Sequence, residues 1–331
     1  MKRLYLITLI VTTASYLGQA QTPSAPIASP LQVGAFLPGI VNPRDYANPG
    51  TSGLVFMDYN VFFTANEYID RNGDKVNSID LPLGLGTKPL DIDISGYMNF
   101  LALAYISPEL SFLGSPRYIA FVSPYFSTAD FRLALSELTV EDQEVTGSTG
   151  GWGDLSVAPL FLTWAGSNDK YDITAGYMFT LPTGRYETGA DDNVGLGYSN
   201  HVFQLYGYYY LMQKATVLYL GNTFETHSKV KDIDVRPGNR YTLEYGLSQY
   251  LTERFEVNVQ GGHTWQVGED SGSDVYWDTS FKDKYSTIGV GLGYWPVTDI
   301  LYLNLKWWTN YAIRQHFKFN SYQHLQPTIL D

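Results

Sequence analysis

The chain has 331 residues and no cysteine. Disulfide bridges, thiol nucleophiles and thiolate metal ligands are therefore excluded, and stability must come from packing and hydrogen bonds. Basic residues are also scarce, with 21 Lys and Arg against 33 Asp and Glu and a formal net charge of -12. Because an acidic surface repels phosphate backbones, we expect no nucleic-acid partner.

Beyond residue 20 the chain lacks an apolar run of the roughly 20 residues that a membrane-spanning helix needs. Its N-terminus carries Lys2 and Arg3, then the apolar run 4–11, then the small residues Gly18 and Ala20 on either side of Gln19. This arrangement predicts a secretory signal peptide over residues 1–20, cleaved before Gln21. Cleavage would leave 19 basic residues against 33 acidic ones, a net charge of -14. A membrane anchor is the alternative, but the apolar run is about half the length required.

What the chain has instead is alternation with period two. Apolar residues at 241, 243, 245 and 247 interleave with polar or small ones, and the pattern recurs at 255–260, 287–294 and 301–308. This predicts β-strands with one apolar and one polar face, in a soluble sandwich or in a membrane barrel. The 27 Tyr, 17 Phe, 7 Trp and 31 Gly beside only 16% charged residues favour the barrel, because lipid-embedded barrels carry aromatic girdles.

The connections between the predicted strands alternate in length. We predict twelve strands, at 54–69, 96–107, 117–135, 152–164, 171–186, 198–210, 215–227, 239–250, 255–267, 285–295, 300–312 and 317–326. Short connections at 108–116, 165–170, 211–214, 251–254 and 296–299 alternate with longer, polar ones near 70–95, 136–151, 187–197, 228–238 and 268–284. Short periplasmic turns, long external loops and an even strand number are typical of bacterial outer-membrane barrels.

The sequence therefore predicts an all-β fold, a closed antiparallel transmembrane β-barrel over residues 51–331, in the cell outer membrane of a Gram-negative bacterium. The expected partners are outer-membrane lipid, lipopolysaccharide, the barrel assembly machinery and a small-molecule substrate. The least regular strand is the last, because the chain ends Gln326 to Asp331 without the terminal aromatic residue usual for such barrels.

Residues 21–50 do not fit the strand pattern. Six prolines in this segment exclude a central strand or a helix. We predict an extended periplasmic arm that folds into or across the periplasmic mouth of the barrel as a plug, with a flexible tail as the alternative. The candidate plug residues are apolar side chains that need a surface to cover: Leu31, Val33, Phe36, Leu37, Ile40 and Val41.

The polar face of the strands supplies candidate lumen-lining residues. If the apolar side chains face lipid, the lumen receives Asp172, Glu244, Glu256, Asn258, Gln260, Asn304 and Lys306. Buried charges must pair or meet water. These residues form either a salt-bridged network that fills the barrel or the lining of an aqueous path, and twelve strands are compatible with both.

Several motifs resemble a known family. They are Gly151-Trp152-Gly153-Asp154, Pro159, Trp164, Tyr171-Asp172, Gly176 and Leu181-Pro182-Thr183-Gly184-Arg185-Tyr186. This pattern resembles the putative meta-pathway of phenol degradation family, which is distantly akin to the long-chain fatty-acid channels. The resemblance implies an outer-membrane barrel that takes up hydrophobic molecules, and it supplies no catalytic residues. Independently of it, Pro182, Thr183 and Gly184 suit a bend at a strand end, a structural role.

Motifs for catalysis or metal binding are weak. The sequence has no Gly-x-Ser-x-Gly elbow and no His-Glu-x-x-His pair. His263 continues an outward apolar face, which suits either the interfacial girdle or, less well, a lipid-hydrolysing site like that of outer-membrane phospholipase A. The segment 70–74 mimics half of a calcium loop but is equally a hairpin turn. We therefore expect no cofactor and no specific metal, although the acidic pairs Asp191-Asp192 and Glu269-Asp270 could bridge loosely to lipopolysaccharide through divalent cations.

Together these features predict a channel or transporter that passes small, hydrophobic or aromatic compounds by passive diffusion, and not an enzyme. A sealed structural barrel or membrane anchor is the alternative. A lipid-modifying outer-membrane enzyme is the remaining hypothesis, and it depends on His263 alone.

Overall fold

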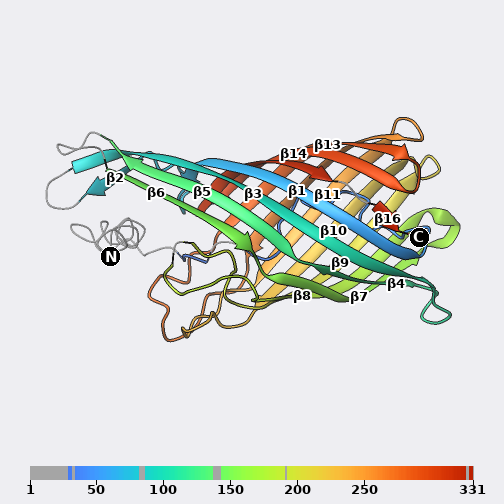
Figure 1. The fold of residues 1–331 in the computed structure, drawn as a ribbon, viewed down its shortest axis with the longest axis horizontal. Helices are drawn as coiled ribbons and strands as arrows, with labels where there is room; N and C mark the ends of the chain where they lie inside the picture. Colours follow the sequence, from blue (N-terminus) through green and yellow to red (C-terminus); the bar gives the residue numbers. More distant parts are fainter. Residues whose placement is uncertain are drawn as a thin grey trace.

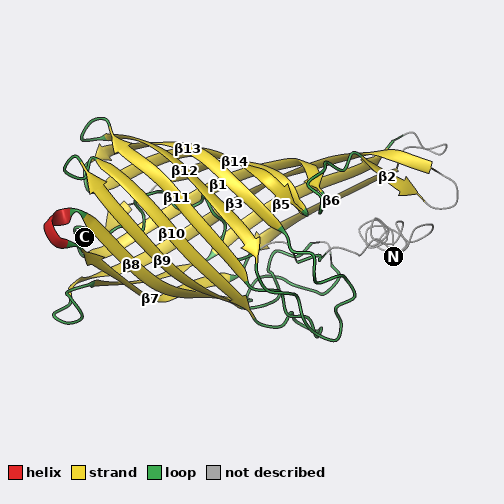
Figure 2. Ribbon diagram, turned by 180° about the vertical axis from the view of Figure 1, so that it is seen from behind, coloured by secondary structure: helices red, strands yellow, loops and turns green. Residues whose placement is uncertain are grey.

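The computed structural model describes residues 29–31, 34–81, 86–136, 143–190, 192–325 and 328–330. In this part of the chain the only helical element is a short 3-10 turn, Ser167–Asp169, and no helix is long and apolar enough to cross a membrane. The strands form one closed antiparallel barrel (Figures 1 and 2). The prediction of an all-β barrel is confirmed.

The described residues form sixteen strands. They are β1 (Gly53–Ile69), β2 (Ser78–Leu81), β3 (Gly86–Glu109), β4 (Arg117–Ser123), β5 (Tyr125–Leu135), β6 (Gln143–Trp152), β7 (Leu155–Ala165), β8 (Tyr171–Leu181), β9 (Asn200–Leu211), β10 (Thr216–His227), β11 (Arg240–Tyr250), β12 (Phe255–Gln266), β13 (Lys284–Val297), β14 (Leu301–Arg314), β15 (His316–Leu325) and β16 (Thr328–Leu330).

These sixteen strands occupy twelve positions in the barrel wall, because several of them are two segments of one interrupted strand. β4 and β5 both pair with β3 and are one strand interrupted at Pro124, which has no N–H to donate. β6 and β7 continue each other across residues 153–154, β15 and β16 both lie along β1, and β2 pairs only with β3. The wall is therefore twelve-stranded, as predicted.

The barrel closes between its first and last strands. β15 pairs with β1 from Tyr59↔Leu325 to Ile69↔His316, and it pairs with β14 on its other side. The closing strand predicted over 317–326 is thus present despite the missing terminal aromatic residue. Closure gives every strand a partner on both sides at the level of the membrane, where an open edge would leave backbone groups without hydrogen bonds.

Two stretches that were predicted to be long loops contain strands instead. Residues 86–95 extend β3, and residues 143–151 form most of β6. In the first stretch Leu90, Ile92 and Ile94 alternate with acidic residues, a strand pattern hidden by its Asp and Pro content. The second is rich in Gly, Thr and Ser, which resembles a loop in composition. As a result β3, β5 and β6 extend beyond the neighbouring strands, at the left of Figure 1.

The two ends of the barrel differ. The turns 110–116, 166–170, 212–215, 251–254 and 298–300 gather at one end, called here the short-turn end, which lies beside the C label in Figure 1. The loops 182–199, 228–239 and 267–283 gather at the other, the long-loop end. By the usual rule for bacterial barrels, the short-turn end faces the periplasm.

Candidate functional site

The inner face of the barrel is polar on strands β8 to β14. The seven lumen-lining candidates are all buried, with at most 6% of any side chain exposed: Asp172, Glu244, Glu256, Asn258, Gln260, Asn304 and Lys306. Their sequence neighbours Ile173, Tyr245, Val259 and Leu305 are exposed on the outer face. The alternation therefore directs the candidates inward, and they are covered there instead of lining open water.

The cover is the N-terminal arm, defined as the described residues 29–31 and 34–50. At the long-loop end the hydroxyl of Ser29 donates to Asp270, which precedes β13. At the short-turn end the amide of Asn48 donates to Asp172 at the start of β8, 3.0 Å away. The arm was predicted as a plug of the lumen, inside or across the periplasmic mouth, and its described contacts run from one end of the strands to the other.

In the long-loop half of the lumen, the arm is bound by Glu225 and Arg240. The Glu225 carboxylate accepts hydrogen bonds from the amides of Ala35 (2.8 Å) and Phe36 (3.2 Å). Arg240 donates to the carbonyl oxygen of Leu31 (3.1 Å). A Cβ at Gly34 would lie 2.7 Å from a carboxylate oxygen of Glu225, so a larger residue would force this side chain to shift.

At the middle of the lumen, three predicted residues bind the backbone of the arm. Lys306 donates to the carbonyl oxygens of Ile40 (2.9 Å) and Val41 (3.1 Å). Gln260 donates to those of Gly39 (3.0 Å) and Val41 (3.2 Å). Glu244 accepts from the amide of Gly39 (3.0 Å). Wall side chains thus satisfy the hydrogen-bonding groups that a segment without secondary structure would otherwise bury unpaired.

Near the short-turn end the arm contributes its own charges. Arg44 donates to Ser248 (2.8 Å) and to the carbonyl oxygens of Lys214 (3.0 Å) and Ala215 (2.9 Å). Its guanidinium also lies 3.5 Å from Glu256. This ion pair gives the buried Glu256 carboxylate the partner that its position requires.

Asp45 accepts a hydrogen bond from the hydroxyl of Tyr59, on β1, at 2.9 Å. Asn258 and Asn304 do not touch the arm in any described hydrogen bond, although Asn304 donates to Tyr302 at 3.4 Å. Five of the candidates are therefore brought together around the arm by β8, β11, β12 and β14, and the two asparagines make no described hydrogen bond to it.

The apolar plug candidates occupy different environments. Leu31 packs on a cluster in the external loops, Phe36 is buried, and Ile40 packs against Tyr59 and Tyr302. Leu37 and Val41 are partly buried, and Val33 lies outside the described residues. Apolar contact was the predicted cause of docking, yet the backbone of the arm is also held by hydrogen bonds to Glu225, Gln260 and Lys306 of the wall.

The external loops cover the arm at the long-loop end. Tyr198, Val230, Val235 and Trp277 form a buried cluster against which Leu31 packs. Asp270 accepts hydrogen bonds from the amide of Gly238 (2.7 Å) and the indole of Trp277 (2.8 Å) in addition to Ser29. Asp270 is 4% exposed, so it is not available for the loose cation bridging that the sequence suggested. Asp191 lies outside the described residues, and the described part of the chain holds no cluster suited to a metal ion.

The lumen contains a second feature that sequence reasoning missed, a cluster of tyrosines. Tyr206, Tyr208, Tyr210 and Tyr219 form one buried group on β9 and β10, and Tyr46 of the arm packs against it. Their parity along the strands could have identified them, since Tyr206, Tyr208 and Tyr210 alternate with outward-facing residues. Glu225 and Arg240 could have been found in the same way.

A family model described as "Putative MetA-pathway of phenol degradation" matches residues 65–324. The chain belongs to this family. Among solved structures it is similar to the COG4313 outer membrane channel from Pseudomonas putida F1, with a TM-score of 0.66 and 17% identity over 88% of this chain and 100% of that one. No curated protein sequence matches it.

Two other solved structures are more distant. The transport unit of the autotransporter AIDA-I from Escherichia coli has a TM-score of 0.46 and 10% identity, covering 97% of each chain. A FadL homologue from Pseudomonas aeruginosa has a TM-score of 0.35 and 9% identity, covering 83% of this chain and 89% of that one. The closed barrel with its apolar outer face is the fold of an outer-membrane channel, and the outer membrane is its location.

Two of the motifs that carry the family resemblance, at 151–154 and 181–186, meet at one point of the wall. Asp154, at the break between β6 and β7, accepts hydrogen bonds from the amides of Gly184 (2.9 Å) and Leu196 (2.8 Å). The hydroxyl of Thr183, which follows Pro182, accepts one from the amide of Leu155 (2.9 Å). A Cβ at Gly153 would lie 2.0 Å from the ring of Tyr125. The two motifs thus fasten the loop 182–199 to the wall.

His263 lies on the outer face, as predicted for a girdle residue. Its Nδ1 lies 2.7 Å from the hydroxyl of Ser286, and its Nε2 lies 3.2 Å from that of Tyr245. The third group is therefore a tyrosine instead of the carboxylate or amide that usually orients a catalytic histidine. Ser286 is also buried, with 6% of the residue exposed, so its hydroxyl is poorly accessible to an acyl substrate. This pair does not form an acyl-transfer site.

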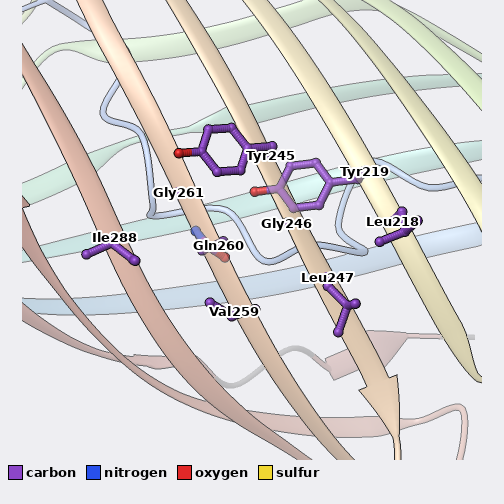
Figure 3. Close-up of a pocket in the computed structure, with 9 residues that line it drawn as sticks. All are labelled: Leu218, Tyr219, Tyr245, Gly246, Leu247, Val259, Gln260, Gly261 and Ile288. Atoms are coloured by element: carbon purple, nitrogen blue, oxygen red, sulfur yellow. The ribbon is translucent and has the colours of Figure 1, made fainter.

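An apolar depression of about 370 Å³ lies in the wall over β10 to β13 (Figure 3). Outward-facing Leu218, Tyr245, Leu247, Val259 and Ile288 surround it, and Gly261 leaves it unfilled. It therefore belongs to the lipid-facing surface and not to the lumen.

Proposed function

We propose that this protein is a channel that lets small, hydrophobic or aromatic compounds diffuse passively across the outer membrane, with the N-terminal arm as a displaceable plug. One observation carries the proposal. The wall closes through β1 and β15 without the arm, so the lumen is filled by a segment that could leave without breaking the barrel. A sealed barrel would more simply fill its interior with wall side chains.

The proposed substrate class is supported by the lumen. Tyr206, Tyr208, Tyr210 and Tyr219 give it an aromatic surface beside the arm. The family description refers to phenol degradation, and the similar structure from Pseudomonas putida is called an outer membrane channel. Aromatic side chains favour flat, apolar solutes that can stack on them.

The remaining partners are proposals as well. We propose that the outward apolar face contacts outer-membrane lipid and lipopolysaccharide, and that the barrel assembly machinery inserts the chain after removal of residues 1–20.

The test is the conductance of the refolded barrel in planar bilayers with and without residues 21–50. We expect the deletion to raise conductance and to speed the entry of p-cresol into liposomes. A matched control replaces residues 29–50 with a Gly/Ser linker of equal length, which keeps the connection but removes the contacts. If neither variant conducts more than the intact protein, the barrel is a sealed anchor.

A further inference from the structure

The arm places a phenol inside the lumen. The ring of Tyr46 stacks on Phe161 of β7, with centroids 5.5 Å apart and an angle of 9° between the planes. It also lies against Tyr206 of β9, at 4.6 Å and 34°. Phe161 and Tyr206 are almost completely buried. The Tyr46 ring therefore lies between two aromatic faces that belong to the wall.

Glycines on the neighbouring strands make this slot. A Cβ at Gly176 would lie 2.2 Å from the ring of Phe161, and one at Gly221 would lie 2.3 Å from the ring of Tyr206. Each ring thus lies flat over bare backbone, which leaves its other face free to stack. The slot is built by the wall, and the arm only fills it.

The slot also has a polar end. The hydroxyl of Tyr46 interacts with the side chain of Gln204, which is 4% exposed. Gln204 donates to the hydroxyl of Tyr206 (3.1 Å), and that hydroxyl donates to Glu244 (3.1 Å). Among the described residues, Oε1 of Gln204 has no hydrogen-bond partner. A buried acceptor without a partner favours a ligand that carries a donor.

We propose that this slot binds a small monocyclic phenol in place of the Tyr46 ring, and that binding there displaces the arm. The inference rests on the proposed function, for which it names the substrate class and the means of opening. A saturated ring would lose the stacking on Phe161 and Tyr206, and an unsubstituted aromatic ring would lose the hydrogen bond.

Displacement of the ring is coupled to the arm because hydrogen bonds flank it closely. Thr174 donates to the carbonyl oxygen of Tyr46 itself (2.6 Å), and the amide of Asn48 donates to Asp172. These bonds fix the backbone on both sides of the ring, so we expect the ring to leave the slot together with this part of the arm. A phenol that occupies the slot therefore shifts the population toward an arm released at its short-turn end, since it binds only that state.

The first test uses Tyr46→Ala in the full chain, folded in detergent, with p-cresol as the probe because it is the side-chain analogue of tyrosine. We expect calorimetry to show p-cresol bound about tenfold or more tightly by the variant than by the intact protein, since the competing ring is gone. Toluene and cyclohexanol should bind more weakly than p-cresol. Phe36→Ala is the matched control, because it removes an aromatic ring from the same arm outside the slot.

The second test does not depend on the folding of Tyr46→Ala. The chain has no cysteine, so Ala47→Cys introduces a single thiol beside an intact Tyr46. We expect p-cresol to raise the alkylation rate of this thiol with a saturable dependence, and cyclohexanol to leave it unchanged. A cysteine in place of the exposed Met212 should react at a constant rate.

The slot assignment is overturned if p-cresol binds Tyr46→Ala no better than the intact protein or Phe36→Ala. The coupling between the slot and the arm is overturned if p-cresol does not change the alkylation rate of the thiol at position 47. Liposome flux separates these failures from failure of the proposed function. If p-cresol binds at the slot but does not cross the membrane, the slot is supported and the proposed channel function is contradicted. If p-cresol crosses without binding at the slot, the channel function is supported and this inference is contradicted.

Discussion

Two parts of the barrel wall, unequal in strand number and leaving out β15 and β16, have different inner faces. On β8 to β14, called here the polar half, the buried inward side chains include Asp172, Glu225, Arg240, Glu244 and Lys306. On β1 to β7, the apolar half, the buried inward positions are mostly small or apolar: Val61, Ala65, Ala102, Ala104 and Ala158. Apart from Tyr59, no described residue of these seven strands is both ionisable and buried.

This difference explains how the arm is bound. Its hydrogen bonds to Glu225, Gln260 and Lys306 all involve the polar half. Toward the apolar half, Ile40 packs among apolar side chains, and Asp45 accepts the hydrogen bond from Tyr59. An apolar solute that enters between the arm and the apolar half would therefore break few polar contacts. We expect the arm to separate first from the apolar half of the wall.

The largest expected effect comes from Arg240→Ala in the polar half. Arg240 makes two hydrogen bonds to Asp283, at 2.7 and 2.8 Å, and both side chains are buried. Removing the guanidinium leaves a buried carboxylate unpaired, a change that costs about 3–5 kcal/mol. Urea unfolding in lipid vesicles, followed by tryptophan fluorescence, measures the loss.

The control for this comparison is an exposed ion pair. Arg185 lies 3.3 Å from Asp192, with about half of each side chain exposed. Arg185→Ala should therefore lower the free energy of unfolding by less than about 1 kcal/mol. Equal losses for Arg185→Ala and Arg240→Ala would mean that the buried charges of the polar half do not stabilise the barrel.

The next effect is confined to the arm. Lys306→Ala removes two charge-assisted hydrogen bonds to the arm, and such bonds contribute about 1.5–3 kcal/mol. Alkylation of a cysteine at Ala47 should then become about ten to a hundred times faster. Lys318→Ala, which removes a half-exposed pair with Glu67 on the apolar half, is the matched control and should not change the rate. An unchanged rate in Lys306→Ala would show that other contacts suffice to fix the arm.

The polar half was largely predictable from sequence, because strand parity depends only on local alternation. Glu244, Gln260 and Lys306 alternate along their strands with apolar residues. Their side chains therefore point inward once the apolar face is assigned to lipid. The same reasoning failed for residues 86–95, where Asp91 and Asp93 suggested a loop. Those residues extend beyond the neighbouring strands, and there no lipid requires an apolar outer face.

The path of the arm was not predictable in the same way. Its proline-rich sequence has no period, so its place depends on contacts with residues far along the chain, such as Glu225 and Arg240. The apolar residues drew attention because they avoid water, yet Arg44 and Tyr46 make contacts that are more specific. Neither pattern nor composition identifies which luminal slot a given side chain fills.

A smaller effect is expected at Asp154, on the boundary of the apolar half. Asp154→Ala leaves the amides of Gly184 and Leu196 without their acceptor, which costs about 1–3 kcal/mol for a buried donor. Because both amides belong to the loop 182–199, hydrogen exchange there should accelerate while β8 to β14 stay protected. In Asp154→Asn, which keeps one acceptor oxygen, the exchange rate of this loop should lie between the rates of the intact protein and of Asp154→Ala. Exchange that accelerates equally across the barrel would contradict this local role.

The smallest effect concerns the external loops that cover the polar half. Lys229 pairs with Asp234, which also accepts hydrogen bonds from the amide (3.2 Å) and hydroxyl (3.0 Å) of Ser273. These contacts lower the pKa of Asp234 to about 2, and the contact with Lys229 has the largest effect. A carboxyl in an unfolded chain titrates near 3.9, so the pairing stabilises the loops above about pH 4 and is lost as the pH falls toward 2. The amide proton shift of Ser273, followed by NMR, should therefore titrate with a midpoint near 2, and Asp234→Asn should abolish that titration. A midpoint near 4 would mean that the loop 228–239 is not tied to the loop 267–283 through this carboxylate.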